Sequence, residues 1–519
     1  MSTPTRNSPR PPRADGKDRF TRDQRRAILG ASVGNTIEFY DFTVYGVLAV
    51  YIGQHFFPEA EPSVQLLSSF AVFGLAFLAR PIGSIILGPL ADRIGRKPVL
   101  IMALSGIALA SFGIGILPTY ETIGILAPIA LVALRFLQGL SAGGEYGSGS
   151  TFMAEYSPRG RRGLGVVWIV VSTTAGVLLG TLTVTGLTLV MGTAGMADWG
   201  WRIPFILALP LGLIGWYIRQ KIDESPEFQM MEATEQKTKS PLTESLKMWQ
   251  NMLIIFGIGA MHATAYYSVF TYMPTYIGVV NGHGQEIALV SNIVTGLVSI
   301  GVIIAAAILS DRVGRKTVLL VGAGTYVLIA WPAYAIVPML NAWGAIGVHI
   351  LLGASVAVFM GASAVIMTEL FPAKIRASGM SLGYNIPAAV FGGGAPFVAT
   401  FLIAQTGITS SAAWYVMAIA VLALVSATVL NPKKHLYDDS EIAEEYEKVI
   451  AEEQSDGSLQ HVVVDADGDR VSADGAAGAA GVPGTEAGAG SPVDVPPRLE
   501  AEVEQALEDV DVSRRRALD

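Results

Sequence analysis

Apolar runs recur along the first 430 residues of the chain and are separated by short polar segments. A run of about twenty apolar residues crosses a bilayer as an α-helix. The pattern therefore predicts an all-α membrane protein with twelve transmembrane helices. We place them at residues 27–52, 66–90, 98–117, 123–147, 164–191, 202–218, 252–279, 286–309, 317–339, 343–368, 379–404 and 412–430.

Basic residues alternate from one connecting loop to the next. Lys and Arg are absent from the loops near 53–65, 118–122, 192–201, 280–285, 340–342 and 405–411. The intervening loops contain Arg93, Arg96, Lys97, Arg159, Arg161, Arg162, Arg312, Arg315, Lys316, Lys374 and Arg376, and residues 1–26 add eight more. The positive-inside rule then predicts a multi-pass protein of the cytoplasmic (plasma) membrane with both termini in the cytoplasm.

The two parts of the apolar region repeat one another. GPLADRIGRKPVL (88–100) follows the second predicted helix, and AAILSDRVGRKTVL (306–319) follows the eighth. AEYSPRGRRG (154–163) has a weaker echo in TELFPAKIRAS (368–378). Repeats of this kind are typical of transporters with a substrate site between two halves. We divide the chain into a basic N-terminal segment (1–26), a six-helix half (27–218), a central cytoplasmic loop (219–250), a second, pseudo-symmetric six-helix half (251–430) and an acidic, mostly disordered cytoplasmic tail with short helices (431–519).

Five ionisable side chains fall within the first four predicted helices, namely Glu38, Asp41, Arg80, Arg135 and Glu145. A charge at the bilayer centre costs at least about 2.5–3.5 kcal/mol, so each should face a partner or a wet cavity. Glu38 and Arg135 lie at similar depth, about 17 Å from the ends of their helices, which suggests that they face each other. Burial favours a neutral carboxyl group and a nearby arginine favours an ionised one.

Movement between those two settings would load and release a proton. We therefore predict Glu38, Asp41 and Arg135 as proton-coupling residues, with the proton as the coupling ion and no other cofactor. The alternative is that these ion pairs only tie helices together. The same two interpretations stay open for Asp41, whereas for Arg80 and for His262 in the seventh helix the packing interpretation is favoured.

Composition narrows the classes of function. The chain has 519 residues, of which 51% are hydrophobic and 15% are charged, against about 25% charged in a soluble domain. It has no cysteine, which excludes disulfides and thiolate metal sites. Motifs for metal binding, phosphate binding or a catalytic triad are missing, so an enzyme is disfavoured, and nothing indicates a nucleic-acid partner. The two-half repeat disfavours a channel.

At these motifs the sequence resembles the major facilitator superfamily, whose G-x-L-A-D-R-x-G-R-K loop occurs here in both halves, with Ala307 in place of glycine in the second. Within that superfamily, GNTIEFYDF (34–42), RFLQGLSAGGEYG (135–147), AEYSP and DWGWRIPF (198–205) resemble the metabolite:proton symporters. The segments GGEYGSGSTFMAEYSP and TYMPTYI (271–277), with the acidic tail, are most similar to the osmoregulatory proline/glycine betaine:proton symporters.

The resemblance implies that contacts among the basic loops hold the cytoplasmic side shut. Asp92 can accept hydrogen bonds from the N-terminus of a neighbouring helix, where the helix dipole favours an anion. Arg96 can pair with Glu155 at the end of the fourth helix. For Glu145, two interpretations stay open, namely contact with the 93–97 loop and a role in transport. The alternative for all the charges of the basic loops is that they only determine the membrane topology. The predicted gating residues are Asp92, Arg93, Arg96, Glu145, Glu155, Asp311 and Arg315.

Aromatic residues lie beside the acids in sequence. A cage of rings suits a quaternary ammonium group through cation–π attraction, although aromatic residues are also ordinary membrane packing. In the family, the first, fourth, seventh and tenth helices line the cavity. The substrate-binding candidates are Tyr40, Gln138, Trp168, Tyr267 and Tyr384.

The function implied by the resemblance is proton-coupled uptake of a small zwitterion such as glycine betaine, proline or ectoine, with osmotic activation. The alternative is a proton symporter for an organic anion such as citrate, α-ketoglutarate or shikimate. The cavity of an organic-anion symporter would carry surplus Arg or Lys. In this sequence three acids balance Arg135 and Arg80, which favours a zwitterion. The bilayer, including anionic lipid, is an expected partner. The tail segment 497–517 carries a short amphipathic stripe, which indicates regulation or self-association, or else only a solvated tail.

Overall fold

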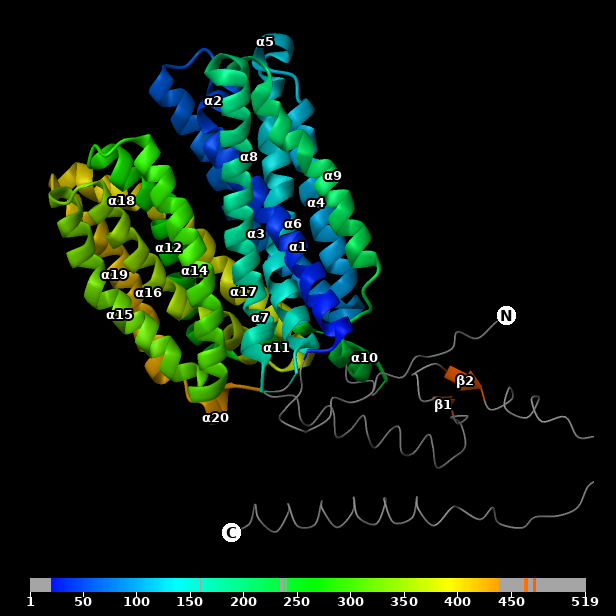
Figure 1. Ribbon diagram of the computed structural model, residues 1–519. Helices are drawn as coiled ribbons and strands as arrows, with labels where there is room; N and C mark the ends of the chain where they lie inside the picture. Colours follow the sequence, from blue (N-terminus) through cyan, green and yellow to red (C-terminus); the bar gives the residue numbers. More distant parts are fainter. Residues whose placement is uncertain are drawn as a thin grey trace, which may run out of the picture. The chain divides into compact units, whose positions relative to one another are not determined.

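A computed structural model gives the fold and describes residues 20–158, 160–233, 238, 240–437, 462–464 and 470–472. The chain divides into two units, Met1–Val449 and Ile450–Asp519. Helices make up nearly all of the described part of the first unit, in agreement with the predicted all-α fold (Figure 1).

The first half and the central loop contain the helices that precede residue 248. They are α1 (Arg22–Val47), α2 (Ala49–Phe56), α3 (Pro62–Ile94), α4 (Arg96–Ile116), α5 (Tyr120–Ile123), α6 (Leu126–Tyr156), α7 (Arg162–Val166), α8 (Trp168–Asp198), the 3₁₀ turn η1 (Gly200–Arg202), α9 (Ile203–Gln220), α10 (Pro226–Ala233) and α11 (Pro241–Lys247). The chain enters α1 through a capping box, in which Thr21 and Gln24 exchange side-chain-to-backbone hydrogen bonds.

The second half repeats this plan with more interruptions. Its elements are α12 (Trp249–Tyr267), η2 (Ser268–Tyr272), α13 (Met273–Thr275), η3 (Tyr276–Val280), α14 (Gln285–Val313), α15 (Arg315–Ile336), η4 (Val337–Met339), α16 (Ala342–Glu369), η5 (Ala373–Ile375), α17 (Arg376–Pro387), η6 (Ala388–Gly392), α18 (Ala395–Thr406), η7 (Thr409–Ser411), α19 (Ala412–Val429) and α20 (Pro432–His435). Of the η elements, η2, η3 and η6 are π-helical turns within the seventh and eleventh spans, close to Pro274 and Pro387.

Each predicted span corresponds to one helix or to consecutive helices. Within the described residues, eleven helices are long and apolar enough to cross a membrane. The first span, formed by α1 and α2, is the exception, because Asn35, Glu38 and Asp41 interrupt its apolar character. The predicted proton-coupling acids Glu38 and Asp41 are thus among the residues that make this helix less apolar than the other spans.

The two copies of the D-R-x-G-R-K motif end one helix and begin the next. Gly95 separates α3 from α4 with φ 108°, and Gly314 separates α14 from α15 with φ 96°. Only glycine adopts such values without strain. The glycine therefore turns the chain sharply and leaves the Asp and Arg that flank it on the same end of each half.

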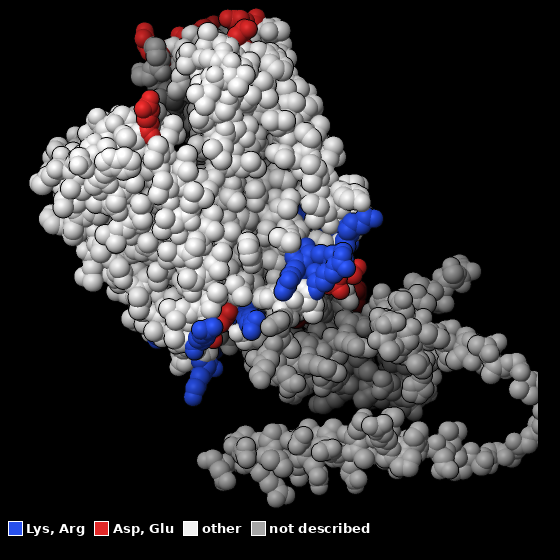
Figure 2. Space-filling view, viewed as in Figure 1, with Lys and Arg blue, Asp and Glu red and all other residues white. Residues whose placement is uncertain are grey.

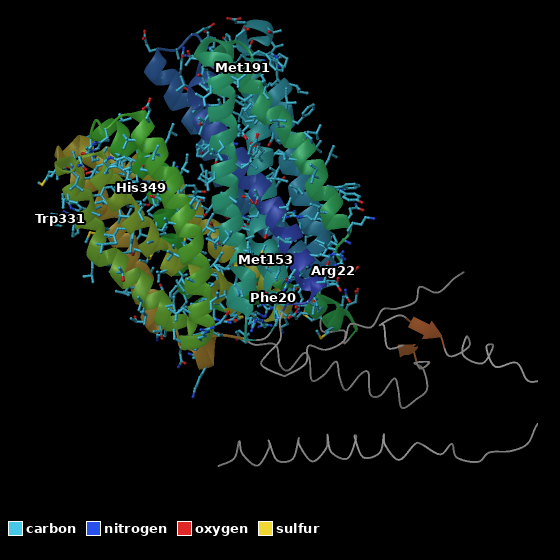
Figure 3. All side chains as sticks on the ribbon, in the orientation of Figure 1. Phe20, Arg22, Met153, Met191, Trp331 and His349 are labelled. Carbon is cyan, nitrogen blue, oxygen red and sulfur yellow. The ribbon has the colours of Figure 1, made fainter. Side chains whose placement is uncertain are left out.

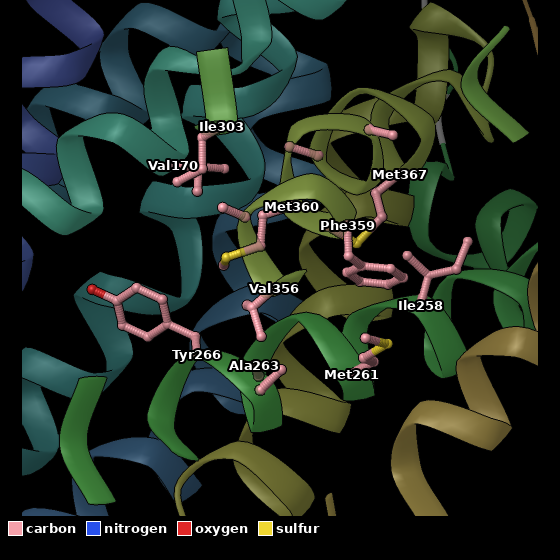
Figure 4. Close-up of a cluster of buried hydrophobic side chains, with 14 of the residues drawn as sticks. Val170, Ile258, Met261, Ala263, Tyr266, Ile303, Val356, Phe359, Met360 and Met367 are labelled. Carbon is pink, nitrogen blue, oxygen red and sulfur yellow. The ribbon is translucent and has the colours of Figure 1, made fainter. Parts of the chain in front are cut away.

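The two halves meet at one end and stand apart at the other. In Figure 1 the ribbons converge near α7, α11 and α17, and they are separated near α2 and α18. One hydrophobic cluster extends across the halves. Figure 4 shows part of it, in which Val170 of α8 lies beside Ile303 of α14.

Charged and apolar side chains are segregated on the surface of the first unit. Figure 2 shows Lys and Arg gathered at the end that carries α7, α10 and α20, with Asp and Glu at the opposite end near α5. Between these ends the surface is apolar. The large side chain of Trp331 is exposed there (Figure 3), and that of Leu328 is exposed as well. An apolar belt between two polar ends suits a lipid environment.

The C-terminal region begins with a docked segment. Asn251 donates to the carbonyl of His435 at 3.1 Å, and the Tyr437 amide donates to the carbonyl of Glu369 at 2.8 Å. In the second unit, the Val-rich strand β1 (Val462–Val464) pairs antiparallel with β2 (Arg470–Ser472), which the sequence analysis did not predict. The rest of the predicted tail (431–519), with its amphipathic stripe at 497–517, lies outside the described residues.

Candidate functional site

Asp92, near the end of α3, binds the first turn of α17 in the opposite half. Its carboxylate accepts the amide N–H of Ala377 at 3.2 Å and that of Ser378 at 2.9 Å, and it accepts the Ser378 hydroxyl at 2.5 Å. The first turn of a helix has free N–H groups and the positive end of the helix dipole, so it favours an anion. The predicted contact of Asp92 with a neighbouring helix N-terminus is confirmed.

Arg96, the first residue of α4, reinforces this contact. Its Nη2 donates to Glu155 Oε1 at 3.0 Å and to the carbonyl of Ala373 at 2.6 Å, and all three residues are buried. The predicted pair with Glu155 is confirmed. Glu155 also faces Arg376 at 3.5 Å and accepts the hydroxyl of Ser225, so one carboxylate joins the first half, the second half and the central loop.

The second copy of the motif makes the reciprocal contact. Asp311 in α14 accepts the amide N–H groups of Gly163 and Leu164, in the first turn of α7, at 2.9 and 3.0 Å. Arg315 donates to Asp311 at 2.7 Å and forms two hydrogen bonds with Glu369, at 2.5 and 2.6 Å. Asp311 and Arg315 therefore form a pseudo-symmetric copy of the Asp92–Arg96 arrangement.

The central loop adds a further acid to this end of the protein. Glu224 accepts the amide N–H of Lys97 at 3.0 Å and that of Ser225 at 2.9 Å. Burial raises the pKa of Glu224, and the hydrogen bonds from Ser225 and Lys97, together with Arg96, partly offset that rise. Of the remaining predicted gating residues, Arg93 is exposed at the end of α3.

Glu145 pairs with an arginine of α9 and not with the 93–97 loop. It forms a two-pronged ion pair with Arg219 of α9, with one contact at 3.0 Å. Arg219 also donates to the carbonyls of Leu100 and Ala31, so it connects α1, α4, α6 and α9. The proposed contact of Glu145 with the 93–97 loop is wrong in this conformation, because Glu145 is paired with Arg219, whose guanidinium fills the space that Gly34 leaves open in α1.

Glu38 lies against Arg80 of α3. Arg80 Nη2 donates to Glu38 Oε1 at 2.8 Å, and the two side chains are 1% and 0% exposed. The guanidinium also lies over the rings of Phe42 at 4.4 Å and Phe77 at 4.9 Å. Two of the charged atoms, Glu38 Oε2 and Arg80 Nε, have no hydrogen-bond partner.

Asp41 lies against Arg135 of α6 and forms a second pair, which Gln138 bridges. Its Oδ2 lies 3.8 Å from Arg135 Nη1 and accepts a hydrogen bond from Gln138 at 2.5 Å. Gln138 in turn accepts from Arg135 at 2.8 Å and donates to Ser111 at 2.7 Å. The network joins α1, α4 and α6 within the first half.

The expected pairing of Glu38 with Arg135 is therefore wrong. Glu38 pairs with Arg80, and Arg135 pairs with Asp41. Depth along a helix could be read from the sequence, but rotation about the helix axis could not. The Phe42 ring contacts both arginines, with its centre 4.4 Å from the Arg80 guanidinium and 5.1 Å from that of Arg135.

Aromatic and polar side chains of the two halves meet beside Glu38. Tyr146 of α6 stacks on Tyr384 of α17 at 4.1 Å, and its hydroxyl lies 3.0 Å from His262 Nε2. His262 Nδ1 lies 2.8 Å from the Ser363 hydroxyl, so the favoured interpretation of His262 as a hydrogen-bonded packing residue agrees with the structure. Sequence reasoning missed Tyr146, although it directly follows Glu145.

The substrate-binding candidates do not form one cluster. Tyr267 lies edge-to-face on Phe77 at 5.4 Å, and Tyr384 joins the Tyr146–His262 group. Tyr40 instead donates to the carbonyl of Pro204 within the first half, and Gln138 is occupied by Asp41 and Arg135. Trp168 lines a peripheral groove with Phe20, Arg25, Ile28, Leu29 and Leu164.

Glycines bring these helices into contact. A Cβ on Gly143 would overlap the backbone of Arg80, and one on Gly393 would lie 3.1 Å from the Phe77 ring. Small residues at these positions let the helices approach closely. In the described part of the chain, no group of three or more His, Asp or Glu side chains is placed to hold a metal ion.

Known proteins resemble both the sequence and the fold. The family model described as "Sugar (and other) transporter" matches residues 27–432. The proline/betaine transporter of Escherichia coli (strain K12) is 34% identical over 465 residues, which cover 85% of this chain and 92% of that one. The alpha-ketoglutarate permease of the same organism is 35% identical over 431 residues, which cover 81% and 97%. Among solved structures, the proton:xylose symporter XylE bound to 6-bromo-6-deoxy-D-glucose has a TM-score of 0.67 at 17% identity and covers 83% of this chain and all of its own.

Proposed function

Because the chain belongs to the sugar (and other) transporter family of the major facilitator superfamily, we propose that it couples uptake of a small zwitterionic solute to proton entry. The protein is a multi-pass membrane transporter of small solutes. Glycine betaine, proline and ectoine are the solutes proposed. No cofactor other than the proton is part of the proposal.

The observation that carries the coupling is the buried ion pair between Glu38 and Arg80. Burial of a carboxylate costs free energy, which a positively charged partner offsets. A rearrangement of the Glu38–Arg80 pair therefore changes the proton affinity of Glu38. The rings around the pair touch the opposite half through Phe77 and Tyr267. A change in how the halves meet would therefore act on Glu38 directly.

The balance of charge supports a zwitterion. Each buried acid near the middle of the first half has its own arginine: Glu38 has Arg80, Asp41 has Arg135 and Glu145 has Arg219. A site for a di- or tricarboxylate would carry unbalanced positive charge. The organic-anion alternative keeps one argument in its favour, which is the 35% identity to the alpha-ketoglutarate permease.

The contacts of Asp92 and Asp311 support alternating access. Both tie the halves together at the end where Lys and Arg gather (Figure 2). We propose that this end is cytoplasmic, following the positive-inside rule, and that the conformation is open to the outside. Entry of solute and proton would then be followed by rupture of these contacts.

Uptake into proteoliposomes tests the proposal. The full-length protein is reconstituted, a proton gradient is imposed, and accumulation of labelled glycine betaine, proline, ectoine, citrate and α-ketoglutarate is followed with and without a protonophore. We expect a zwitterion to accumulate only when the gradient is present. Glu38→Gln should abolish accumulation but keep part of the solute exchange, whereas Glu121→Gln, at an exposed acid, should match wild type. Accumulation that is insensitive to the protonophore would contradict proton coupling, and accumulation of citrate or α-ketoglutarate alone would favour the alternative.

A further inference from the structure

We propose that Arg80 binds the carboxylate of the transported solute, and that Glu38 occupies Arg80 until a proton neutralises Glu38. The inference rests on the proposed function and adds to it the residue that recognises the solute and the way in which the proton makes that residue available. It applies to any solute with a carboxylate, so it is independent of the choice between a zwitterion and an organic anion.

The contact between the two residues is incomplete. An arginine and a carboxylate can form two parallel hydrogen bonds, which is their strongest arrangement. Here a single hydrogen bond of 2.8 Å joins them, and Glu38 Oε2 and Arg80 Nε lack partners although both side chains are buried. Arg80 therefore has unused capacity for a second carboxylate, directed by a planar guanidinium that suits that group.

Arg80 also lies within aromatic rings of the kind that bind organic cations. The guanidinium carbon is 4.4 Å from the centre of the Phe42 ring, 4.9 Å from that of Phe77 and 5.9 Å from that of Phe39. The arginine itself lies over these ring faces. A solute carboxylate that drew Arg80 aside would free those faces for the solute's own cationic group.

The position of the pair lets the two halves act on it. Phe77 lies edge-to-face on Tyr267 at 5.4 Å, and Phe39 lies edge-to-face on Tyr266 at 6.2 Å, both across the boundary between the halves. A Cβ on Gly393 of the second half would approach Phe77 to 3.1 Å. Rotation of one half on the other would thus move the rings that hold Arg80.

The Asp41–Arg135 pair is the natural comparison, and it is held differently. Gln138 bridges Asp41, Arg135 and Ser111, and all of these residues belong to the first half. The rings over Arg135, from Tyr45, Phe42 and Phe73, also belong to the first half. Arg135 has unpartnered nitrogens as well, but among the ring contacts of the described residues these three rings stack only on rings of the first half.

The exchange of partners explains coupling. A proton on Glu38 removes the charge that attracts Arg80, and Arg80 can then bind the solute carboxylate. When the solute leaves, Arg80 attracts the ionised form of Glu38 again and the proton is released. By linkage, the proton and the solute each favour binding of the other. The charged and titratable groups that face Glu38 are Asp41, Arg80, Glu145, Tyr146, Arg219, Tyr267 and Tyr384.

Solute exchange without a gradient tests the inference, because it needs binding but not energy coupling. In wild type, the KM for the transported panel solute should fall as the pH is lowered. Arg80→Gln should raise KM by about 10- to 150-fold, which corresponds to loss of a hydrogen bond to a charged group, and Arg80→Lys should raise it less. Glu38→Gln should keep KM low at every pH, because Arg80 is then permanently available.

Choline provides the second measurement, since it has the trimethylammonium group of glycine betaine but no carboxylate. Arg80→Gln should bring inhibition by glycine betaine down to the level of inhibition by choline. Arg26→Gln, at an exposed arginine, is the matched control and should change neither value. The inference is overturned if Arg80→Gln and Arg80→Lys keep the wild-type KM and the preference over choline, or if Arg135→Gln alone removes that preference. A wild-type protein that exchanges none of the panel contradicts the proposed function and this inference together.

Discussion

Asp92 and Asp311 make the same contact in opposite directions. Asp92 of the first half binds the first turn of α17 in the second half, and Asp311 of the second half binds the first turn of α7 in the first. Each is backed by an arginine and a glutamate, Arg96 with Glu155 and Arg315 with Glu369. The halves are thus joined at one end by two reciprocal clamps.

The clamps predict how Asp92→Asn and Asp311→Asn will behave. Each change removes the charge that the helix N-terminus favours but keeps the shape of the side chain. Loss of one hydrogen bond to a charged group is worth about 1.5–3 kcal/mol, so either variant should shift the protein toward opening at this end and slow net transport. The protein should still insert, because no apolar contact is lost.

Labelling of an introduced cysteine measures the shift. Ser381 lies against Gly147 across the boundary between the halves, and its hydroxyl has no hydrogen-bond partner. Since the chain has no cysteine, Ser381→Cys supplies the sole thiol. Its labelling rate should be low in the parent and higher in each Asp→Asn variant, and equal rates in all three would show that the clamps do not govern opening.

Gly34→Ala should disrupt the first half. A Cβ at this position would overlap the guanidinium of Arg219, which is buried in its pair with Glu145. Breaking a buried pair costs about 3–5 kcal/mol, so the apparent Tm in detergent should fall well below that of wild type. Gly46 is the matched control, because it lies in the same helix with nothing within 4 Å of an added Cβ. Gly46→Ala should leave the Tm unchanged or slightly raised, and a similar fall in both variants would implicate helix α1 in general rather than Arg219.

Glu224 predicts a pH dependence of stability. Its pKa is raised above the ordinary value of 4.5 mainly by burial. The folded protein therefore binds the proton more tightly than the unfolded chain, so this contribution to stability is fully present below about 4.5 and is lost as the pH rises through the folded pKa. Glu224→Gln should make the Tm depend less steeply on pH above about 4.5, where the carboxyl group of the unfolded chain is ionised. If the Tm of wild type and of Glu224→Gln depends on pH with the same slope, the buried carboxyl group of Glu224 does not cause the pH dependence.

Much of the architecture was readable from the sequence because the membrane imposes it. Apolar length and the alternation of loop charge sufficed for the spans, and the D-R-x-G-R-K repeat sufficed for the two halves. The contacts of Asp92 and Arg96 were also predictable, because a motif that ends one helix and begins another confines its side chains to one end of the bundle.

The partners of the buried charges were not predictable in the same way. Glu38 met Arg80 rather than Arg135, and Glu145 met Arg219 rather than the loop. Each outcome depends on the rotation of helices about their axes, which the glycines of α1 and α6 decide by allowing close approach at particular faces. Likewise, Tyr40 is one residue from Phe39 but points to Pro204, because neighbours along a helix face different ways.

The start of the C-terminal tail is bonded to one of the clamps. The Tyr437 amide donates to the carbonyl of Glu369, whose carboxylate holds Arg315, and Asn251 secures His435 beside it. Whatever acts on the tail beyond Tyr437 thus has a short path to the contacts of Glu369 and Arg315. This gives the expected osmotic role of the tail a structural attachment.

Deletion of residues 455–519 should leave the maximal transport rate near wild type but shift the osmolality at which activity rises. Loss of water concentrates the salt in the cytoplasm. The distance over which exposed charges interact, about 8 Å at physiological ionic strength, then becomes shorter. Repulsion within the acidic tail, and between the tail and anionic lipid, then weakens. The conformational equilibrium responds only as far as the tail interacts differently with the two states. Activation curves in proteoliposomes with fixed internal salt measure the shift. Asn251→Ala, which removes the side-chain hydrogen bonds to the carbonyls of His435 and Leu370 while the tail is kept, should shift the curve in the same direction if the attachment at His435 transmits the signal. A deletion variant whose curve overlays that of the full-length protein would show that residues 455–519 take no part in activation.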